Sequence, residues 1–262
     1  ARAPRPACRA PLALRLRRPY GPPMPSKVRL FVDHPLGAGQ TVPLEPAQAH
    51  YLFGVMRLGP GAVISTFNSR DGEWDAEVAQ AGKKRGTLAC TVRTAPLRMP
   101  PDLWLVFAPL KKTRTDFIVE KAAELGAARI LPVQTDFGNA DRIRQDRLQA
   151  HATETAEQCG GTYVPPVAPL QKLSKLLDGW DTARRIMYCD EDRLSGPAGT
   201  TGDPGPWAIL IGPEGGFSPP EKQRLRAMDH VVPVSLGPRI LRADTAAVAA
   251  LTLWQSTLGD WR

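Results

Sequence analysis

Two segments near the C-terminus hold the residues best suited to chemistry. The first, Ile211 to Glu221, reads IGPEGGFSPPE, and the second, Leu236 to Leu251, reads LGPRILRADTAAVAAL. In each segment an apolar run ends in a Gly-Pro turn, and a helical pattern follows. Adjacent glycines let a ligand approach the backbone, whose free N–H groups can then bind a flat heterocycle or an anion. A tight turn between a strand and a helix, with no ligand, is the alternative for the first segment.

Three charged residues in these segments are candidates for acting on a substrate. Arg242 stands two residues before Asp244 at the expected start of an Ala-rich helix, and Glu214 lies among the glycines of the first segment. A guanidinium held beside a carboxylate is a fixed cation that can face a substrate. The alternative is that Asp244 only caps the helix and that the arginine is solvated.

The elements around both segments predict an α/β domain over residues 97–262. Apolar strands alternate with helices there, which is typical of a parallel, doubly wound sheet. Ligands bind such sheets beyond the carboxyl ends of the strands, where both segments are expected to lie. The expected strands cover Leu103–Ala108, Ile130–Val133, Arg185–Cys189, Trp207–Ile211 and Val231–Val234, and the expected helices cover residues 113–125, 143–159, 170–177, 219–228 and 245–258. The first of these helices is placed by the capping-box spacing of Thr113 and Asp116.

Residues 27–96 predict a small β-barrel. Short apolar runs alternate there with turn signals such as Asp71-Gly72, and one helix, from about Pro46 to Met56, interrupts them. Residues 1–26 begin with an Arg- and Pro-rich stretch and predict a disordered extension, of the kind produced by translation from upstream of Met24. An organelle signal is the alternative for this extension.

Composition and charge narrow the class of protein. The chain has 262 residues, of which 42% are hydrophobic and 23% charged, so it is neither wholly disordered nor a disulfide miniprotein. The net charge of +8 suggests a nucleic-acid partner. However, residues 1–23 hold six of the 34 basic residues and no acid, which leaves 28 basic against 26 acidic residues, a net of +2. Overall charge is therefore weak evidence for RNA binding.

Several common classes of site find no support in the sequence. Cys8, Cys90, Cys159 and Cys189 show no metal-ligand spacing, nor do the four histidines, so we expect no metal and reduced thiols in a cytoplasmic protein. No apolar run reaches roughly 18 residues, so we expect no membrane-spanning helix. The motifs of Rossmann dinucleotide sites, P-loops and GxSxG hydrolases are also absent, which leaves a dinucleotide oxidoreductase only a distant alternative.

The sequence resembles the bacterial 16S ribosomal RNA uridine-N3 methyltransferases of the SPOUT superfamily. The resemblance runs from about residue 27 to the C-terminus, and it depends on several short segments occurring in this order. These are RLFV (Arg29–Val32), HYLFGVMRLGPGAVI (His50–Ile64), KAAELGAARILPV (Lys121–Val133), ETAEQCGG (Glu154–Gly161), IGPEGGFSPPE and LGPRILRADTA. The resemblance implies a PUA-like RNA-binding β-barrel followed by a trefoil-knotted SPOUT α/β domain. It also implies a homodimer whose S-adenosyl-L-methionine pocket lies near the subunit interface.

The implied reaction is S-adenosylmethionine-dependent methylation of uridine N3 in 16S ribosomal RNA, either free or within the small ribosomal subunit. In the family, the two segments wrap the cofactor mainly through backbone groups. The corresponding residues here are Ile211, Gly212, Pro213, Glu214, Gly215, Gly216, Leu236, Gly237, Ile240, Leu241 and Ala246. Arg242 is expected to orient the base or stabilise its negative charge. Asp244 and Glu214 are candidates for the proton acceptor, with a purely structural role as the alternative for each.

RNA contacts are expected from basic residues on the barrel and beside the first α/β loop. They are Arg29, Arg57, Lys111, Lys112 and Arg114. For any one of them taken alone, a solvated surface charge is the favoured alternative. The family often reads LRTETA where this chain has LRADTA, so the carboxylate of Asp244 has a shorter reach. Two other functions stay open: another SPOUT activity, such as ribose 2′-O-methylation, and a non-catalytic RNA-binding factor in ribosome assembly. The intact GPEGG loop speaks against the non-catalytic factor.

Overall fold

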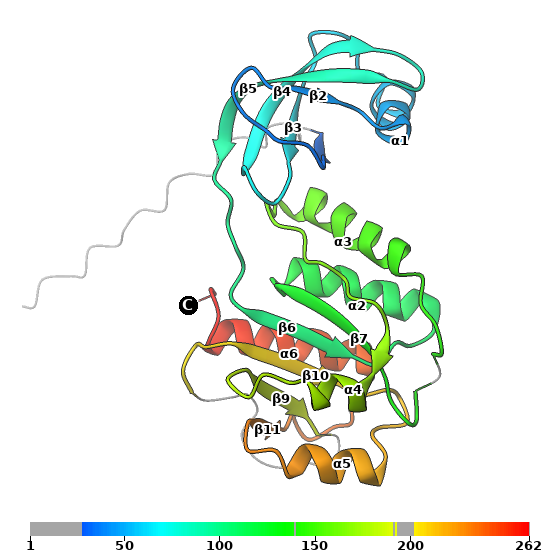
Figure 1. The fold of residues 1–262 in the computed structure, drawn as a ribbon, viewed down its shortest axis with the longest axis vertical. Coiled ribbons are helices and arrows are strands. Elements are labelled where there is room, and N and C mark those ends of the chain that lie inside the picture. The colour runs from blue at the N-terminus through cyan, green and yellow to red at the C-terminus, as the bar shows by residue number, and fades with distance from the viewer. Residues whose placement is uncertain (1–27, 139, 191, 193–201, 262) are drawn as a thin grey trace, which may run out of the picture.

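The computed structural model describes residues 28–138, 140–190, 192 and 202–261, and it contains two β-sheets (Figure 1). The expected N-terminal extension, residues 1–26, lies outside the described residues. Among the described residues, no helix combines the length and the apolar character that crossing a bilayer requires.

The first sheet has five strands in the order β1-β3-β4-β5-β2. The strands are β1 (Arg29–Phe31), β2 (Thr41–Pro43), β3 (Val63–Phe67), β4 (Glu73–Ala81) and β5 (Gly86–Ala95). Strand β1 pairs parallel with β3, and the other pairs are antiparallel. Leu30, Val42, Ile64 and Leu88 are buried between the strands and form a separate small core.

In place of the single expected helix, the barrel has a short α-helix that is followed directly by a π-helix. Helix α1 (Pro46–Ala49) begins with a capping box between Glu45 and Gln48 and continues into the π-helix η1 (His50–Val55). Within η1, Leu52 is buried in the barrel core, while Tyr51 and Val55 are exposed. Strand β2 has only three residues, which are too few to show an alternating pattern in the sequence.

The second sheet has six strands in the order β11-β9-β10-β6-β7-β8, all of them parallel. The strands are β6 (Leu103–Phe107), β7 (Arg129–Gln134), β8 (Gln171–Lys172), β9 (Arg185–Cys189), β10 (Trp207–Ile211) and β11 (Val231–Val234). The prediction of a parallel α/β sheet is confirmed. Its central strands are continuous apolar runs because both faces of the sheet are covered.

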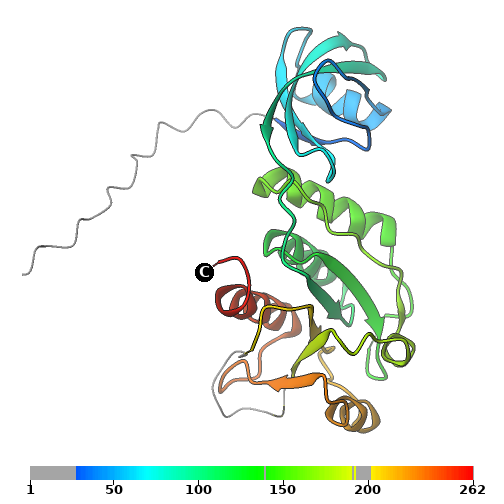
Figure 2. The ribbon, with the colours of Figure 1, turned by 60° about the vertical axis from the view of Figure 1, so that its left-hand side comes forward.

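Helices cover both faces of this sheet (Figure 1). The helices are α2 (Lys112–Glu124), α3 (Gln145–Cys159), α4 (Leu173–Asp178), α5 (Pro219–Arg226) and α6 (Ala243–Thr257). Alternate residues of each strand point to opposite faces, so Leu105 and Ile209 pack with α2, α3 and α6, whereas Val106 and Leu210 pack with α4 and α5. Helix α3 lies between the barrel and α2 in both views (Figure 1, Figure 2).

A partly buried arginine joins the barrel to the end of α3. The guanidinium of Arg29 donates to the backbone oxygens of Ala156 at 2.6 Å, Glu157 at 2.8 Å and Gly161 at 2.9 Å. It also forms an ion pair with Glu73 at 2.8 Å, and only 14% of its side chain is exposed. These contacts satisfy carbonyls that the end of a helix leaves without partners. The placement favours a structural role for Arg29 over the expected RNA contact.

A second contact between the barrel and the end of α3, here called the junction, is a hydrogen bond. The backbone N–H of Phe31 donates to Oε1 of Glu157 at 2.8 Å. Burial raises the pKa of the Glu157 carboxyl above its usual value, more than this hydrogen bond and Arg29 lower it. The junction therefore holds an ionisable group whose charged form is costly to bury.

Candidate active site at the carboxyl edge of the sheet

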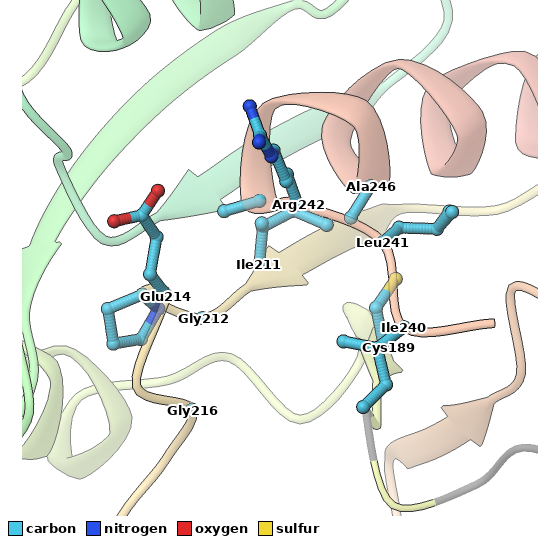
Figure 3. A pocket seen from close by; sticks show the side chains of 11 residues that line it. Cys189, Ile211, Gly212, Glu214, Gly216, Ile240, Leu241, Arg242 and Ala246 are labelled. Carbon is cyan, nitrogen blue, oxygen red and sulfur yellow. The ribbon is translucent and has the colours of Figure 1, made fainter.

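A cavity of about 260 Å³ opens where β9 and β10 end (Figure 3). It is lined by Cys189, Ile211, Gly212, Pro213, Glu214, Gly216, Ile240, Leu241, Arg242, Ala243 and Ala246. The two segments singled out in the sequence thus meet around one cavity, at the edge where parallel sheets bind their ligands.

Most residues expected to hold a cofactor line this cavity, and three do not. Gly215 turns toward Phe137 in the loop after β7, Leu236 packs against the core, and Gly237 bonds through its N–H to Ser235 Oγ at 3.2 Å. Sequence reasoning missed Cys189 and Ala243. The position of Cys189 at the carboxyl end of a parallel strand was the signal that could have identified it.

The first segment follows the buried strand β10 and turns tightly. The N–H of Gly216 donates to the carbonyl of Pro213 at 2.9 Å, and Gly216 has a φ of +71°. The buried ring of Phe217 packs edge-to-face on Tyr188, with 5.4 Å between the ring centroids. A Cβ atom on Gly212 would lie 2.7 Å from the Phe217 ring, so this turn requires glycine at position 212.

The helix after this turn begins as the sequence predicts. Ser218 caps α5, its side chain accepts from the N–H of Glu221, and the carboxylate of Glu221 accepts from the N–H of Ser218 at 2.9 Å. The Ser218 hydroxyl also donates to Asp136 in the loop after β7. The N–H of Asp136 in turn donates to Glu221 at 3.0 Å. These bonds hold the end of the first segment against a neighbouring loop.

The second segment enters α6 two residues earlier than expected. Arg242 occupies the N-cap position with an extended backbone (φ −64°, ψ 151°), and the helix begins at Ala243. Asp244 therefore lies in the first turn, where a carboxylate is favourable for the helix dipole, and not at the cap position. Its Oδ1 accepts from the N–H of Thr245 at 2.9 Å.

Arg114 of α2 lies between a carboxylate of the first segment and a carboxylate of the second. It forms an ion pair with Glu214, and its Nε lies 3.7 Å from Oδ2 of Asp244. The side chain of Arg242, by contrast, forms no hydrogen bond or ion pair with any described residue, and it extends to the same side of the cavity as Glu214 (Figure 3). The site thus combines an unpaired cation with two carboxylates that share a second cation.

Among the residues that the structure describes, the cavity has neither a reactive thiol nor a group of side chains that could hold a metal ion. Burial raises the pKa of the Cys189 thiol to about 12, so this cysteine stays protonated near pH 7. No group of His, Cys, Asp and Glu side chains in the described ranges is arranged to hold a metal ion. These residues are thus suited to binding and electrostatic stabilisation, and Cys189 is unsuited to covalent catalysis.

The residues expected to contact RNA fall into two places. Lys111, Lys112 and Arg114 lie at the start of α2, where Arg114 pairs with Glu214 of the cavity, whereas Arg29 and Arg57 belong to the barrel. Arg57 has a φ of +55°, a conformation uncommon for a residue with a side chain. The structure therefore brings three of the five residues together and leaves the barrel residues apart from them.

Comparison with known proteins matches the barrel and the α/β domain to two separate family models. Residues 98–255 match the model of the RNA methyltransferase domain, which covers more than half of the chain, and residues 44–89 match the model of the RNA methyltransferase PUA domain. The predicted PUA-like barrel before an α/β methyltransferase domain is confirmed at this level.

Several relatives carry the same name, ribosomal RNA small subunit methyltransferase E. The protein of Synechocystis is 30% identical over 80% of this chain and 71% of its own length, and that of Rickettsia conorii is 26% identical over 86% and 88%. A crystal structure of the Neisseria gonorrhoeae protein bound to S-adenosyl methionine superposes with a TM-score of 0.82 at 27% identity, covering 90% of this chain and all of that one. The chain therefore belongs to the RNA methyltransferase family, as the resemblance of its sequence predicts.

Proposed function

We propose that this protein transfers a methyl group from S-adenosylmethionine to N3 of a uridine in 16S ribosomal RNA. The observation that carries the proposal is the convergence of the two glycine-bearing segments on one cavity, in a chain of the RNA methyltransferase family. The names of the relatives and the S-adenosyl methionine bound by the Neisseria protein support the substrate and the cofactor.

The residues around the cavity fit S-adenosylmethionine. Ile211, Ile240 and Leu241 offer apolar surface for the adenine, and the backbone of the first segment offers hydrogen-bonding groups beside it. Ile240 lines the cavity and is 76% exposed, so its side chain is accessible to a bound ligand. When bound, S-adenosylmethionine supplies a methyl group activated on a positive sulfur.

The chain's own charges suit the uracil. N3 carries a proton that must leave during or before the attack, and the negative charge then spreads to O2 and O4. Arg242 is the cation that stabilises this charge, since it lines the cavity and its side chain has no partner among the described residues. Glu214, which lines the cavity, is the preferred proton acceptor over Asp244, which does not.

Three further properties belong to the proposal. The segments that meet at the cavity form the trefoil knot of the SPOUT fold, the active form is a homodimer, and the reaction takes place in the cytoplasm. The family supports the first two, and a ribosomal RNA substrate supports the third. Sedimentation at micromolar concentration tests the dimer, because a mass of twice 28.5 kDa is expected.

The test is methylation of 16S ribosomal RNA, free or in small subunits, by the purified protein with isotope-labelled S-adenosylmethionine. Nucleoside mass spectrometry is expected to find 3-methyluridine. Finding 2′-O-methyluridine would favour the other SPOUT activity, and RNA binding with no methyl transfer would favour the non-catalytic factor. Calorimetry with S-adenosylmethionine distinguishes an inactive preparation from a protein that lacks the cofactor site.

A further inference from the structure

A second cavity, of about 340 Å³, opens between the beginnings of α2 and α3. Lys112 and Asp116 line it from α2, Arg142 and Arg144 from the loop after β7, and Arg147 from α3. Because α2 and the loop follow the parallel strands β6 and β7, this cavity lies at the same edge of the sheet as the proposed methyl-transfer site.

The second cavity has an excess of positive charge. Its charged lining consists of four cations and one acid. The acid, Asp116, is buried and is already paired with Arg147, with His151 Nε2 3.7 Å away. Arg144 pairs at 2.8 Å with the exposed Asp146. This leaves the charges of Lys112 and Arg142 without a carboxylate partner among the described residues.

Lys112 and Arg142 form no hydrogen bond or ion pair among the residues that the structure describes, and both are exposed. The backbone of α2 adds to their charge, because this helix begins at the cavity with no side chain bonded at its N-cap. The first turn of α3 adds less, because it carries Asp146, whose carboxylate accepts from the backbone N–H of Arg147. Free N–H groups and the positive ends of helix dipoles favour an anion. Side chains and backbone thus favour the same kind of ligand.

Helix α2 places the two cavities on either side of its first turn. Residues two positions apart on a helix face different sides. Arg114 reaches Glu214 and Asp244 at the first cavity, whereas Lys112 lines the second. A polyanion whose base enters the first cavity therefore passes within reach of the second.

We propose that the second cavity binds a backbone phosphate of the RNA substrate, close to the nucleotide that is methylated. The inference rests on the proposed function, and it adds a specific anchor made by Lys112 and Arg142. Lysine and arginine without carboxylate partners are the side chains that bind RNA phosphates, and each such contact makes binding depend on salt. The anchor orders the nucleotide without taking part in the chemistry.

The test compares two double variants in the full-length protein. Lys112→Gln with Arg142→Gln removes the unpaired charges, and Arg129→Gln with Arg185→Gln removes two exposed charges at the amino ends of β7 and β9, the opposite edge of the sheet. We expect the first pair to raise KM for RNA roughly tenfold, leaving kcat and the affinity for S-adenosylmethionine unchanged. The slope of log affinity against log salt should also fall by about 1.

Each outcome decides the proposal. An equal loss of RNA affinity in both pairs, or none in the first pair, overturns the anchor, provided that thermal melting shows both variants folded. Inhibition by inorganic phosphate that the first pair relieves, with KM for RNA unchanged, would show a site for a free anion instead. If the wild-type protein does not methylate RNA at all, the proposed function fails, and this result is separate from any difference between the variants.

Discussion

Arg242 lines the cavity at the point where the chain turns into α6, and its charge is not neutralised by any described residue. A fixed cation helps most when negative charge develops in the transition state. We therefore expect Arg242→Ala to lower kcat about 100-fold or more, with S-adenosylmethionine affinity changed less than about threefold. Arg242→Lys should recover part of the rate, because lysine keeps the charge but not the planar fork. Steady-state kinetics and calorimetry measure the two effects, and normal turnover by Arg242→Ala would rule out this role.

The two carboxylates near Arg242 differ in what they can reach. Glu214 lines the cavity and its side chain is 49% exposed, whereas one oxygen of Asp244 is occupied by the N–H of Thr245. We expect Glu214→Gln to lower kcat about 100-fold, as the loss of a general base does, and Asp244→Asn to lower it less than about tenfold. Single-turnover rates across pH make the comparison. The reverse order of the two variants would assign the proton to Asp244.

At the scale of elements, the turn after β10 depends on the absence of a side chain at Gly212. A Cβ there would lie 2.7 Å from the buried ring of Phe217, whereas a Cβ on Gly215 would lie at an ordinary 3.4 Å from Phe137. We expect Gly212→Ala to cost about 1–3 kcal/mol of unfolding free energy and to weaken cofactor binding. Gly215→Ala is the matched control and should leave both nearly unchanged. Denaturant unfolding and calorimetry of the two variants test this, and equal effects would contradict it.

The elements that the sequence predicts well are those whose signal is local. Strands Arg185–Cys189 and Trp207–Ile211 have the predicted bounds, because each is an apolar run between turn residues. The capping box of Ser218 and Glu221 is also local and confirmed. The expected box at Thr113 and Asp116 is wrong: α2 begins at Lys112, and Asp116 is bonded instead to Arg147, 31 residues away.

The candidate site shows the same limit. The glycine-bearing turns are visible in the sequence, so most lining residues could be named in advance. The partners of charged residues could not, because they come from distant elements. Arg114 was expected to contact RNA, but the structure pairs it with Glu214, 100 residues along the chain. A charge in a sequence indicates no partner, and only packing decides whether it is free or bound.

At the scale of the whole molecule, the barrel and the α/β domain are joined through Arg29. Removing its side chain leaves three carbonyls at the end of α3 without this donor and breaks the ion pair with Glu73. We expect Arg29→Ala to cost about 3 kcal/mol of unfolding free energy, as the loss of one partner from a buried charged network does. Arg70→Ala, which breaks an exposed pair with Asp33 on the same barrel, is the control and should cost less than about 1 kcal/mol. Equal costs in denaturant unfolding would show that the junction adds little.

Glu157 makes this junction sensitive to pH. Burial raises the pKa of its carboxyl in the folded protein above the usual 4.5, so the folded state binds the proton more tightly than the unfolded state. The unfolding free energy therefore falls as pH rises from about the usual pKa through the raised one, and it gains nothing back above that window. Glu157→Gln keeps an oxygen for the N–H of Phe31 but cannot ionise.

The stability of Glu157→Gln relative to wild type should therefore increase across this window and then level off. Glu77→Gln, an exposed substitution on β4, controls for the loss of one negative charge from the protein. Denaturant unfolding at a series of pH values measures the difference for each variant. A Glu157→Gln curve parallel to wild type at every pH would mean that the carboxylate is well solvated at the junction. If the two curves diverge as pH rises, the contact between the barrel and α3 is more stable when Glu157 is neutral. Acidification then strengthens the attachment of the barrel until other carboxylates are protonated.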